Sequence, residues 1–349
     1  LVVWAIREGR QAARAVDEVL MGCVLTAGLG QAPARQAALA AGLPESVPCT
    51  TVGKVCGSGM KAVMLGHDAI LAGSAAVVVA GGMESMSNAP YLLDRARAGY
   101  RFGHGAILDH MALDGLEDAY DRGRAMGTFA EDCAAAYGFA RAEQDDFARA
   151  SLTRAQAALA EGRFAAETVA LGEVAQDESP ARARADRIPR LRPAFREGGT
   201  VTAANSSSIS DGAAALVLAP EGAAGAAPLA RILGHATHAQ APALFATAPA
   251  GAIRKLLSRT GWRAGEVDLW EINEAFAVVA MAAMRDLALP HDRVNVNGGA
   301  CALGHPIGAT GARLLVTLAH ALRARGLKRG VAALCIGGGE ATAVAVEVP

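Results

Sequence analysis

The feature that most constrains the fold of this chain is an order of expected helices and strands that occurs twice. Twice along the sequence, a reactive side chain at a turn is followed by a helix, a glycine, a continuous apolar strand and a cluster of glycines. The first copy contains Cys56 and the strand 75–80, and the second contains His305 and the strand 331–336. Helices that alternate with buried strands are typical of a largely parallel sheet, so the repetition predicts an internally duplicated α/β protein.

Composition narrows the class of protein. A chain of 349 residues exceeds a single hydrophobic core, so more than one domain is expected. The net charge of −1 and the pI near 6.8 provide no overall attraction to nucleic acid or to an anionic membrane. Six scattered cysteines without CxxC spacing predict neither a disulfide framework nor a metal site, and they indicate a reducing compartment. With no signal-peptide pattern and no apolar run of membrane length, we expect a cytoplasmic protein.

Cys56 has the sequence setting of a nucleophile. An apolar run precedes it, Gly57 and Gly59 follow, and apolar residues then recur at helical spacing. This pattern predicts a sulfur at the N-terminus of a helix, where unpaired N–H groups and the helix dipole lower the pKa of a thiol. The alternative is a small buried hydrophobic residue, which is the common role of a free cysteine.

Three further turn positions carry reactive groups, namely Asn273, His305 and Cys335. In parallel α/β sheets the loops at the carboxyl ends of the strands converge, so these residues and Cys56 are expected to share one site. A nucleophilic cysteine, a histidine base and a second cysteine as acid or base would support covalent acyl transfer with proton abstraction. Each residue taken alone has a structural alternative, because single histidines and cysteines are often part of a core.

Four motifs resemble those of the thiolases, in the order of that family and over nearly the whole chain. They are the segments 55–61, 273–276, 304–308 and 334–339. The resemblance implies the thiolase fold: two similar α/β halves in a five-layer αβαβα sandwich, with a loop domain covering the CoA arm. The implied divisions are 1–85 with 209–228 for the N-terminal half, 86–208 for the loop domain, and 229–349 for the C-terminal half.

The resemblance also implies a role for each reactive residue. Cys56 would be acetylated after His305 accepts its proton, and Cys335 would then remove an α-proton from a second acetyl-CoA. Two oxyanions need separate donors. One oxyanion hole would use His305 with a water held by Asn273, and the other would use the backbone N–H groups of Cys56 and Gly337.

The activity implied is that of an acetyl-CoA C-acetyltransferase, with acetyl-CoA, acetoacetyl-CoA and CoA as its partners. No cofactor, metal, nucleic acid or membrane is expected, and the implied assembly is a homodimer or homotetramer. The hydroxyl-rich loop 201–212 resembles the family's CoA-contacting serine loop, so Ser207, together with Met126, is expected at the CoA. Three alternatives stay open: a 3-ketoacyl-CoA thiolase of broader chain length, a catalytically impaired acyl-CoA-binding protein, and a ketoacyl synthase, which normally uses two histidines.

The beginning of the chain departs from the family's pattern. Residues 1–14 are interpreted as the remainder of a helix, and nothing before them corresponds to the strand 229–236 of the second copy. We therefore expect that a first strand is missing and that it leaves a slot inside the first sheet, with unpaired backbone groups. On this interpretation the chain is incomplete, or else poorly stable and weakly active.

Overall fold

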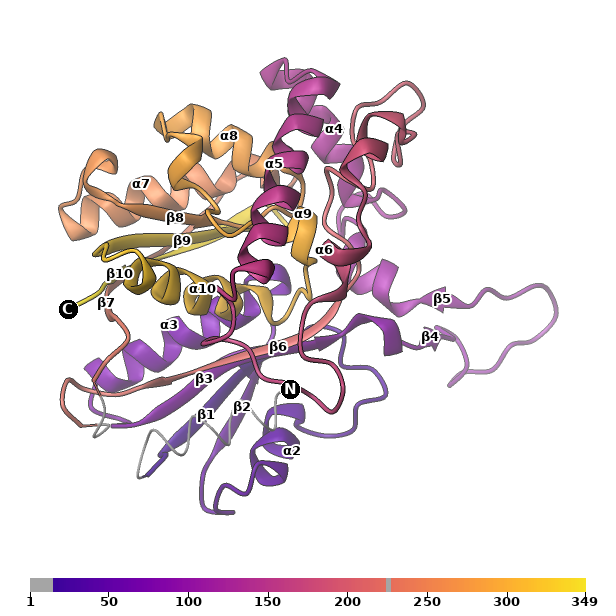
Figure 1. Cartoon of the computed structure of the whole chain (residues 1–349). Coiled ribbons are helices and arrows are strands. Elements are labelled where there is room, and N and C mark those ends of the chain that lie inside the picture. The colour runs from indigo at the N-terminus through magenta and orange to yellow at the C-terminus, as the bar shows by residue number, and fades with distance from the viewer. Residues whose placement is uncertain (1–14, 224–226) are drawn as a thin grey trace.

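The structure is a computed structural model that describes residues 15–223 and 227–349. The helix expected over residues 1–14 lies outside the described residues. The described chain forms two four-stranded sheets and a two-stranded hairpin, with helices between and outside the sheets (Figure 1).

The first sheet is built from the N-terminal part of the chain. Its order is β2 (Cys49–Val52), β1 (Glu18–Gly22), β3 (Val78–Ser85) and β6 (Asp211–Leu218). The β1 strand pairs in parallel with both β2 and β3, and β6 closes the sheet antiparallel to β3. The chain leaves this sheet after β3 and returns to it with β6.

The second sheet repeats this topology. Its order is β8 (Leu269–Ile272), β9 (Arg329–Ile336), β10 (Glu340–Glu347) and β7 (Arg231–Ala239). The β8 and β9 strands are parallel, as β1 and β3 are, and β10 is antiparallel to β9, as β6 is to β3. The internal duplication predicted from element order is confirmed, with β8, β9 and β10 as the counterparts of β1, β3 and β6.

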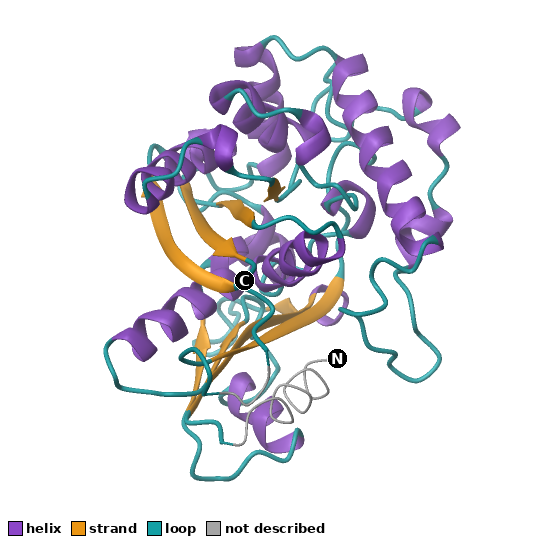
Figure 2. Ribbon diagram, turned by 60° about the vertical axis from the view of Figure 1, so that its left-hand side comes forward, coloured by secondary structure: helices purple, strands orange, loops and turns teal. Residues whose placement is uncertain are grey.

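Helices form three layers around the two sheets. The α3 (Ser58–Leu71) and α10 (Thr310–Ala324) helices lie between the sheets, while α2 (Pro33–Ala40) covers the outer face of the first sheet. The α7 (Ala248–Thr260) and α8 (Ala277–Leu287) helices cover the outer face of the second. Figure 2 shows this succession of helix, sheet, helix, sheet and helix. The predicted five-layer thiolase fold is confirmed.

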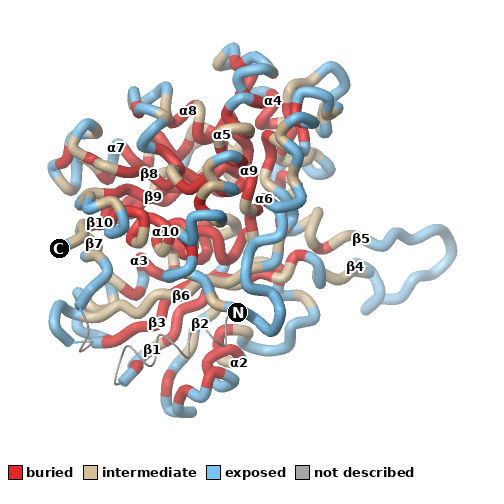
Figure 3. Tube along the Cα trace, viewed as in Figure 1, coloured by how far each residue is buried: buried red, intermediate tan, exposed pale blue. Residues whose placement is uncertain are grey.

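The middle layer is deeply buried (Figure 3). Met60 and Met64 of α3 and Leu314 and Leu318 of α10 are essentially inaccessible to water and belong to one cluster that contacts both sheets. Their spacing of four residues places each pair on one face of its helix. Burying each of these large side chains contributes about 1.5–3 kcal/mol to folding. The two halves are therefore held together by the same helices that carry the reactive turns.

The segment between β3 and β6 contains the remaining long helices, α4 (Met126–Tyr137) and α5 (Arg141–Ala160). The hairpin of β4 (Tyr91–Leu92) and β5 (Leu108–Asp109) extends away from the body of the molecule (Figure 1). The short elements are α6 (Glu178–Arg182), α9 (Ala300–Leu303), the 3₁₀ turns Val55–Gly57, Met86–Asn88, Ala185–Arg190, Pro242–Thr247, Ala264–Glu266 and His291–Arg293, and the π-helical turn Ala112–Leu116. Among the helices of the described ranges, none combines the length and apolar character required to cross a bilayer.

The expectation of an open slot inside the first sheet is wrong. Each of its strands is hydrogen-bonded to its neighbours, and β3 lies directly between β1 and β6. In the second sheet, the extra strand β7 pairs with β10, the counterpart of β6, at the edge. The corresponding place in the first sheet is thus the outer edge of the half-buried β6, where water can satisfy backbone groups. The stability penalty that we predicted for a buried slot therefore does not apply.

Candidate active site

Cys56 lies in a tight turn between the first sheet and helix α3. The 3₁₀ turn Val55–Gly57 follows β2, and α3 begins at Ser58. Val55 has a φ of 45°, a left-handed conformation that is strained for a β-branched residue. The Ser58 hydroxyl holds this conformation, because it accepts a hydrogen bond from the Lys54 N–H (2.8 Å) and donates one to the Val55 carbonyl (2.7 Å). Strain of this kind, supported by dedicated hydrogen bonds, is typical of functional turns.

The pKa of Cys56 differs from the sequence-based prediction. Cys56 keeps a small exposed surface, yet dense packing around the sulfur raises its pKa to about 11. The backbone N–H groups of Gly337 and of Cys56 itself act in the opposite direction by stabilising the thiolate. The prediction of a lowered pKa is wrong, because burial outweighs the helix terminus. Cys56 at rest is therefore a thiol, which would need a base to act as the predicted nucleophile.

His305 is held in one tautomer. Its Nδ1 lies 2.6 Å from the Thr310 Oγ1, and that hydroxyl donates its own hydrogen to the Pro306 carbonyl (2.9 Å). Since the hydroxyl proton is already used, Thr310 accepts from His305, and the imidazole proton resides on Nδ1. The opposite nitrogen, Nε2, then carries a lone pair, and the side-chain N–H of Asn273 points at it from 3.3 Å.

The electrostatic environment keeps the His305 imidazole neutral. Burial lowers its pKa to about 3, and the positive charge of Arg313 acts in the same direction. A neutral imidazole with an unprotonated Nε2 is the form that can accept a proton from a thiol. The oxygen of the Asn273 amide is also buried and has no hydrogen-bond partner within the described ranges, which makes it available to a water or a substrate.

Cys335 is the penultimate residue of strand β9 and is fully buried. Burial raises its pKa well above the usual value, and the neighbouring Cys56 acts in the same direction. The two sulfurs are therefore close enough for the charge of one to affect the pKa of the other. Cys335 belongs to an aromatic cluster that includes Phe129, Phe245 and Phe276. The surroundings of the second cysteine are thus drier and more apolar than those of the first.

The glycine turn after Cys335 approaches both Cys56 and helix α4. The N–H of Gly337 points at the sulfur of Cys56, and its role in an oxyanion hole remains a prediction. A Cβ placed on Gly337 would lie 3.7 Å from the Met126 methyl and 3.7 Å from the Val55 side chain. Met126 therefore lies beside the nucleophile turn. Its predicted contact with CoA remains a prediction.

Ser207 lies next to the Asn273 motif. Both its N–H (3.0 Å) and its hydroxyl (3.1 Å) donate to the Ala275 carbonyl. The same loop contacts the histidine turn, because the His305 N–H donates to the Ser208 carbonyl (3.2 Å). The serine loop thus borders the site, as the resemblance implied. Its contact with CoA remains a prediction.

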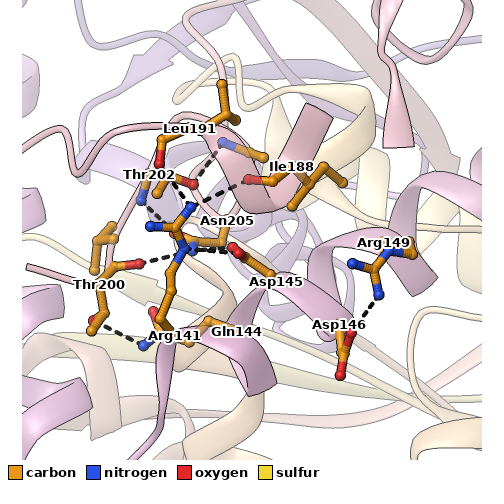
Figure 4. A network of polar contacts seen from close by, with 12 residues as sticks. Arg141, Gln144, Asp145, Asp146, Arg149, Ile188, Leu191, Thr200, Thr202 and Asn205 are labelled. Carbon is orange, nitrogen blue, oxygen red and sulfur yellow. Dashed lines mark hydrogen bonds and ion pairs between the residues drawn. The ribbon is translucent and has the colours of Figure 1, made fainter. Parts of the chain in front are cut away.

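A polar network anchors the serine loop to helix α5 (Figure 4). The Asn205 side chain accepts from the Thr202 N–H (2.7 Å) and donates to Asp145 (3.2 Å) and to the Thr200 carbonyl (3.1 Å). Arg141 forms an ion pair with Asp145 at 2.8 Å, and Gln144 donates to the Thr200 hydroxyl (2.9 Å). Because these groups are buried or partly buried, they fix the position of a loop that has little regular structure of its own.

Two buried carboxylates that the sequence analysis did not single out hold the reactive loops in place. Glu84, at the end of β3, accepts hydrogen bonds from the N–H groups of Val24 (3.1 Å), Leu25 (3.0 Å) and Gly308 (2.9 Å). It thereby ties the histidine turn to the first sheet. Glu274 accepts from Asn295, Ser151 and the Cys301 N–H, at 2.8, 2.7 and 3.0 Å. The sequence signal available for Glu84 was an acidic residue close behind the apolar stretch 75–80 and its two glycines.

The glycine clusters allow the two halves to approach closely. A Cβ added to Gly82 would lie 1.9 Å from the Gly308 carbonyl oxygen, and one added to Gly59 would lie 2.8 Å from the same oxygen. The histidine turn therefore rests directly on the backbone of the first sheet and of α3. Cys56 also shares an apolar cluster with Ile307, two residues after His305. The structure thus brings all four predicted catalytic residues to the junction of the two halves.

A duplicated five-layer fold with two cysteines and a histidine at the junction of its halves defines the class of thiolase-fold acyltransferases. Comparison with known proteins identifies the family. The thiolase N-terminal domain matches residues 4–222, and the thiolase C-terminal domain matches residues 226–348. The chain belongs to the thiolase family and is an acyltransferase. This assignment also sets aside the ketoacyl synthase alternative.

Several named relatives are similar over most of their length. The chain is 50% identical to the acetyl-CoA acetyltransferase of Escherichia coli (strain K12), over 98% of this chain and 90% of that protein. It is 49% identical to the probable acetyl-CoA acetyltransferase of Dictyostelium discoideum, over 95% of this chain and 83% of that protein. The crystal structure of the Acat5 thiolase from Ascaris suum in complex with coenzyme A superposes with a TM-score of 0.94. Its identity is 42%, with 100% of this chain and 93% of that chain covered.

Proposed function

We propose that this thiolase is an acetyl-CoA C-acetyltransferase, which condenses two acetyl-CoA molecules to acetoacetyl-CoA and CoA and catalyses the reverse thiolysis. The observation that carries the proposal is the presence, at the junction of the two halves, of a neutral His305 that is unprotonated at Nε2 and of a Cys56 thiol whose sulfur faces the Gly337 N–H. The names of the relatives that share about half of its residues point to the same reaction.

In the first half-reaction, Nε2 of His305 accepts the proton of Cys56. The thiolate attacks the carbonyl of acetyl-CoA, and the N–H groups of Cys56 and Gly337 donate to the oxyanion. The carbon–sulfur bond to CoA breaks, and the departing CoA thiolate takes the proton of Cys335. The products are acetyl-Cys56, free CoA, an imidazolium at His305 and a thiolate at Cys335.

In the second half-reaction, the Cys335 thiolate removes an α-proton from a second acetyl-CoA. The protonated Nε2 of His305 and a water held by Asn273 donate to the enolate oxygen. The carbanion attacks the acetyl group, and Cys56 leaves with the proton that His305 returns. Every group ends in its starting protonation state, so the cycle needs neither a cofactor nor a metal.

The surroundings of the site favour a short acyl group and a bound CoA. Around Cys335 the rings of Phe245 and Phe276 lie 6.4 Å apart, and Phe195 lies 5.8 Å from Phe276. Bulky side chains beside the second cysteine favour acetyl over longer chains. Met126 and Ser207 border the same site, and we assign them to contacts with the CoA arm.

We further propose a homodimer or homotetramer in the cytoplasm. The hairpin of β4 and β5 extends from the body of the molecule (Figure 1). Its large apolar side chains are exposed. These are Tyr91, Leu93, Phe102 and Ile107. Exposed apolar residues on a projecting arm are typical of an assembly contact, and light scattering of the purified protein tests this.

Initial rates of CoA-dependent cleavage test the proposed activity. The purified protein is assayed with acetoacetyl-CoA and with 3-ketoacyl-CoA thioesters of increasing length, after dialysis against a chelator. We expect the highest kcat/KM with acetoacetyl-CoA, a fall with each lengthening, and no turnover by Cys56→Ser. Equal rates for long chains would favour the broader thiolase, and the absence of any cleavage would favour the impaired acyl-CoA-binding protein.

A further inference from the structure

A cluster of two histidines and an aspartate lies outside the active site. His67 and Asp68 are adjacent on helix α3, and His235 lies on strand β7. One oxygen of Asp68 is 2.8 Å from Nε2 of His235 and 3.7 Å from Nδ1 of His67. The three ligand atoms lie within 4.8 Å of one another.

The His67 nitrogen has no other use within the described residues. Its Nδ1 is buried and lacks a hydrogen-bond partner, and the Asp68 oxygen, at 3.7 Å, is beyond hydrogen-bond distance. A buried imidazole nitrogen without a partner is unusual. Asp68 is half exposed, so the cluster opens toward solvent.

The arrangement of the three atoms is close to that of a metal site. Three ligands bound to a tetrahedral ion at about 2.0–2.1 Å are separated from each other by about 3.3 Å. The separations of 2.8 and 3.7 Å lie on either side of this value, and the third, between the two histidine nitrogens, is at most 4.8 Å, so side-chain adjustments of up to about 1.5 Å bring the three atoms to this geometry. Two imidazoles and a carboxylate form a donor set that zinc and cobalt prefer, with water completing the tetrahedron.

We propose that His67, Asp68 and His235 bind one divalent transition-metal ion of the zinc class. The ion would displace the hydrogen bond between Asp68 and His235 and would use the free nitrogen of His67. The proposal is independent of the acyl-transfer chemistry, to which the cluster contributes no group.

The position of the cluster indicates what the ion would do. Helix α3 packs on the first sheet and begins next to Cys56, whereas β7 is the edge strand of the second sheet. The Arg259 guanidinium binds the His235 carbonyl (2.7 Å), which fixes β7 at this point. A metal here would therefore cross-link the two halves, and its binding would stabilise the folded chain.

Metal titration of the chelator-treated protein tests the proposal. Co²⁺ is the probe, since its visible spectrum reports the ligands, and Zn²⁺ is used in thermal unfolding. We expect one equivalent of Co²⁺ with a tetrahedral spectrum free of thiolate charge transfer. A rise in Tm of about 4 °C is expected at a free Zn²⁺ concentration 100-fold above its Kd.

Variants locate the ion. His67→Gln and His235→Gln should each abolish the Co²⁺ spectrum and the rise in Tm while acetoacetyl-CoA cleavage persists. His104→Gln, a change of the same type at an exposed histidine, should bind as the wild type does. If a glutamine variant does not fold, Asp68→Asn serves in its place. Absence of binding by the wild type, binding that survives these changes, or a cobalt–thiolate band would each overturn the proposal.

Discussion

The hydrogen bond between His305 and Thr310 makes the sharpest prediction about catalysis. Thr310→Val keeps the shape of the side chain but removes the acceptor that lies 2.6 Å from Nδ1 of His305. The site is fully buried, so no bulk water replaces the lost acceptor. We expect the imidazole to lose its preference for the tautomer in which Nε2 is unprotonated.

The size of the effect on the acetylation rate follows from the Nδ1–H of His305, which loses its hydrogen-bond acceptor. Leaving a buried N–H without an acceptor costs about 1–3 kcal/mol, and this cost falls only on the productive tautomer. Acetylation of the nucleophile should therefore slow by about 5- to 150-fold. Thr310→Ser retains the hydroxyl and should stay within about threefold of the wild-type rate.

Single-turnover acetylation by acetyl-CoA, followed by mass spectrometry, measures this rate directly. Thr317→Val is the matched control, because Thr317 is a buried threonine of the same helix whose hydroxyl bonds Glu167 (3.2 Å) rather than the histidine. We expect the control to lose stability but to acetylate normally. If folded Thr310→Val acetylates at the wild-type rate, the tautomer argument is wrong.

Three further predictions concern the second cysteine, the glycine contact and pH. Cys335→Ala should become acetylated more slowly, because the departing CoA thiolate loses its proton donor, and should fail in condensation and thiolysis; acetylation at the wild-type rate would mean that Cys335 does not protonate CoA. Gly82→Ala places a methyl 1.9 Å from the Gly308 oxygen and should lower the free energy of unfolding in urea by about 1–3 kcal/mol or more. Gly265→Ala, which meets no atom within 4 Å, should change it by less than about 0.5 kcal/mol, and equal effects would contradict the packing argument. Because the native pKa of His305 is about 3, kcat/KM should show no inflection near 6.5. The native histidine stays neutral while the unfolded one gains a proton, so the free energy of unfolding should fall from pH 6.5 toward 3 by up to about 5 kcal/mol. An inflection near 6.5, or the same acid destabilisation in His305→Gln, would refute this reasoning.

The chain order of reactive turns, helices and strands was enough to predict the duplicated fold and the meeting of four residues. Short-range patterns carry that information, because a strand followed by glycines and a helix is visible in one window of sequence. The ends of the Met126–Tyr137 and Ala248–Thr260 helices are local signals of the same kind, because each helix stops at a glycine, Gly138 and Gly261 respectively.

What the sequence analysis missed depends on contacts between distant residues. The bond between Glu84 and Gly308 joins positions 224 residues apart, and the histidine–aspartate cluster joins α3 to β7 across 167 residues. The pKa of Cys56 was predicted with the wrong direction, since burial by the other half of the molecule exceeds the effect of its own helix. The slot predicted in the first sheet was wrong for the same reason, because strand order is set by pairing and not by chain order.

The identity of the acetylated residue tests the central claim most directly. The intact protein is incubated with acetyl-CoA, quenched in acid and digested, and each cysteine-containing peptide is examined by mass spectrometry. The proposed mechanism predicts at most one acetyl group per chain, located on Cys56 and absent from Cys56→Ser. An acetyl group on Cys335 or Cys301 instead would contradict the assignment of the nucleophile.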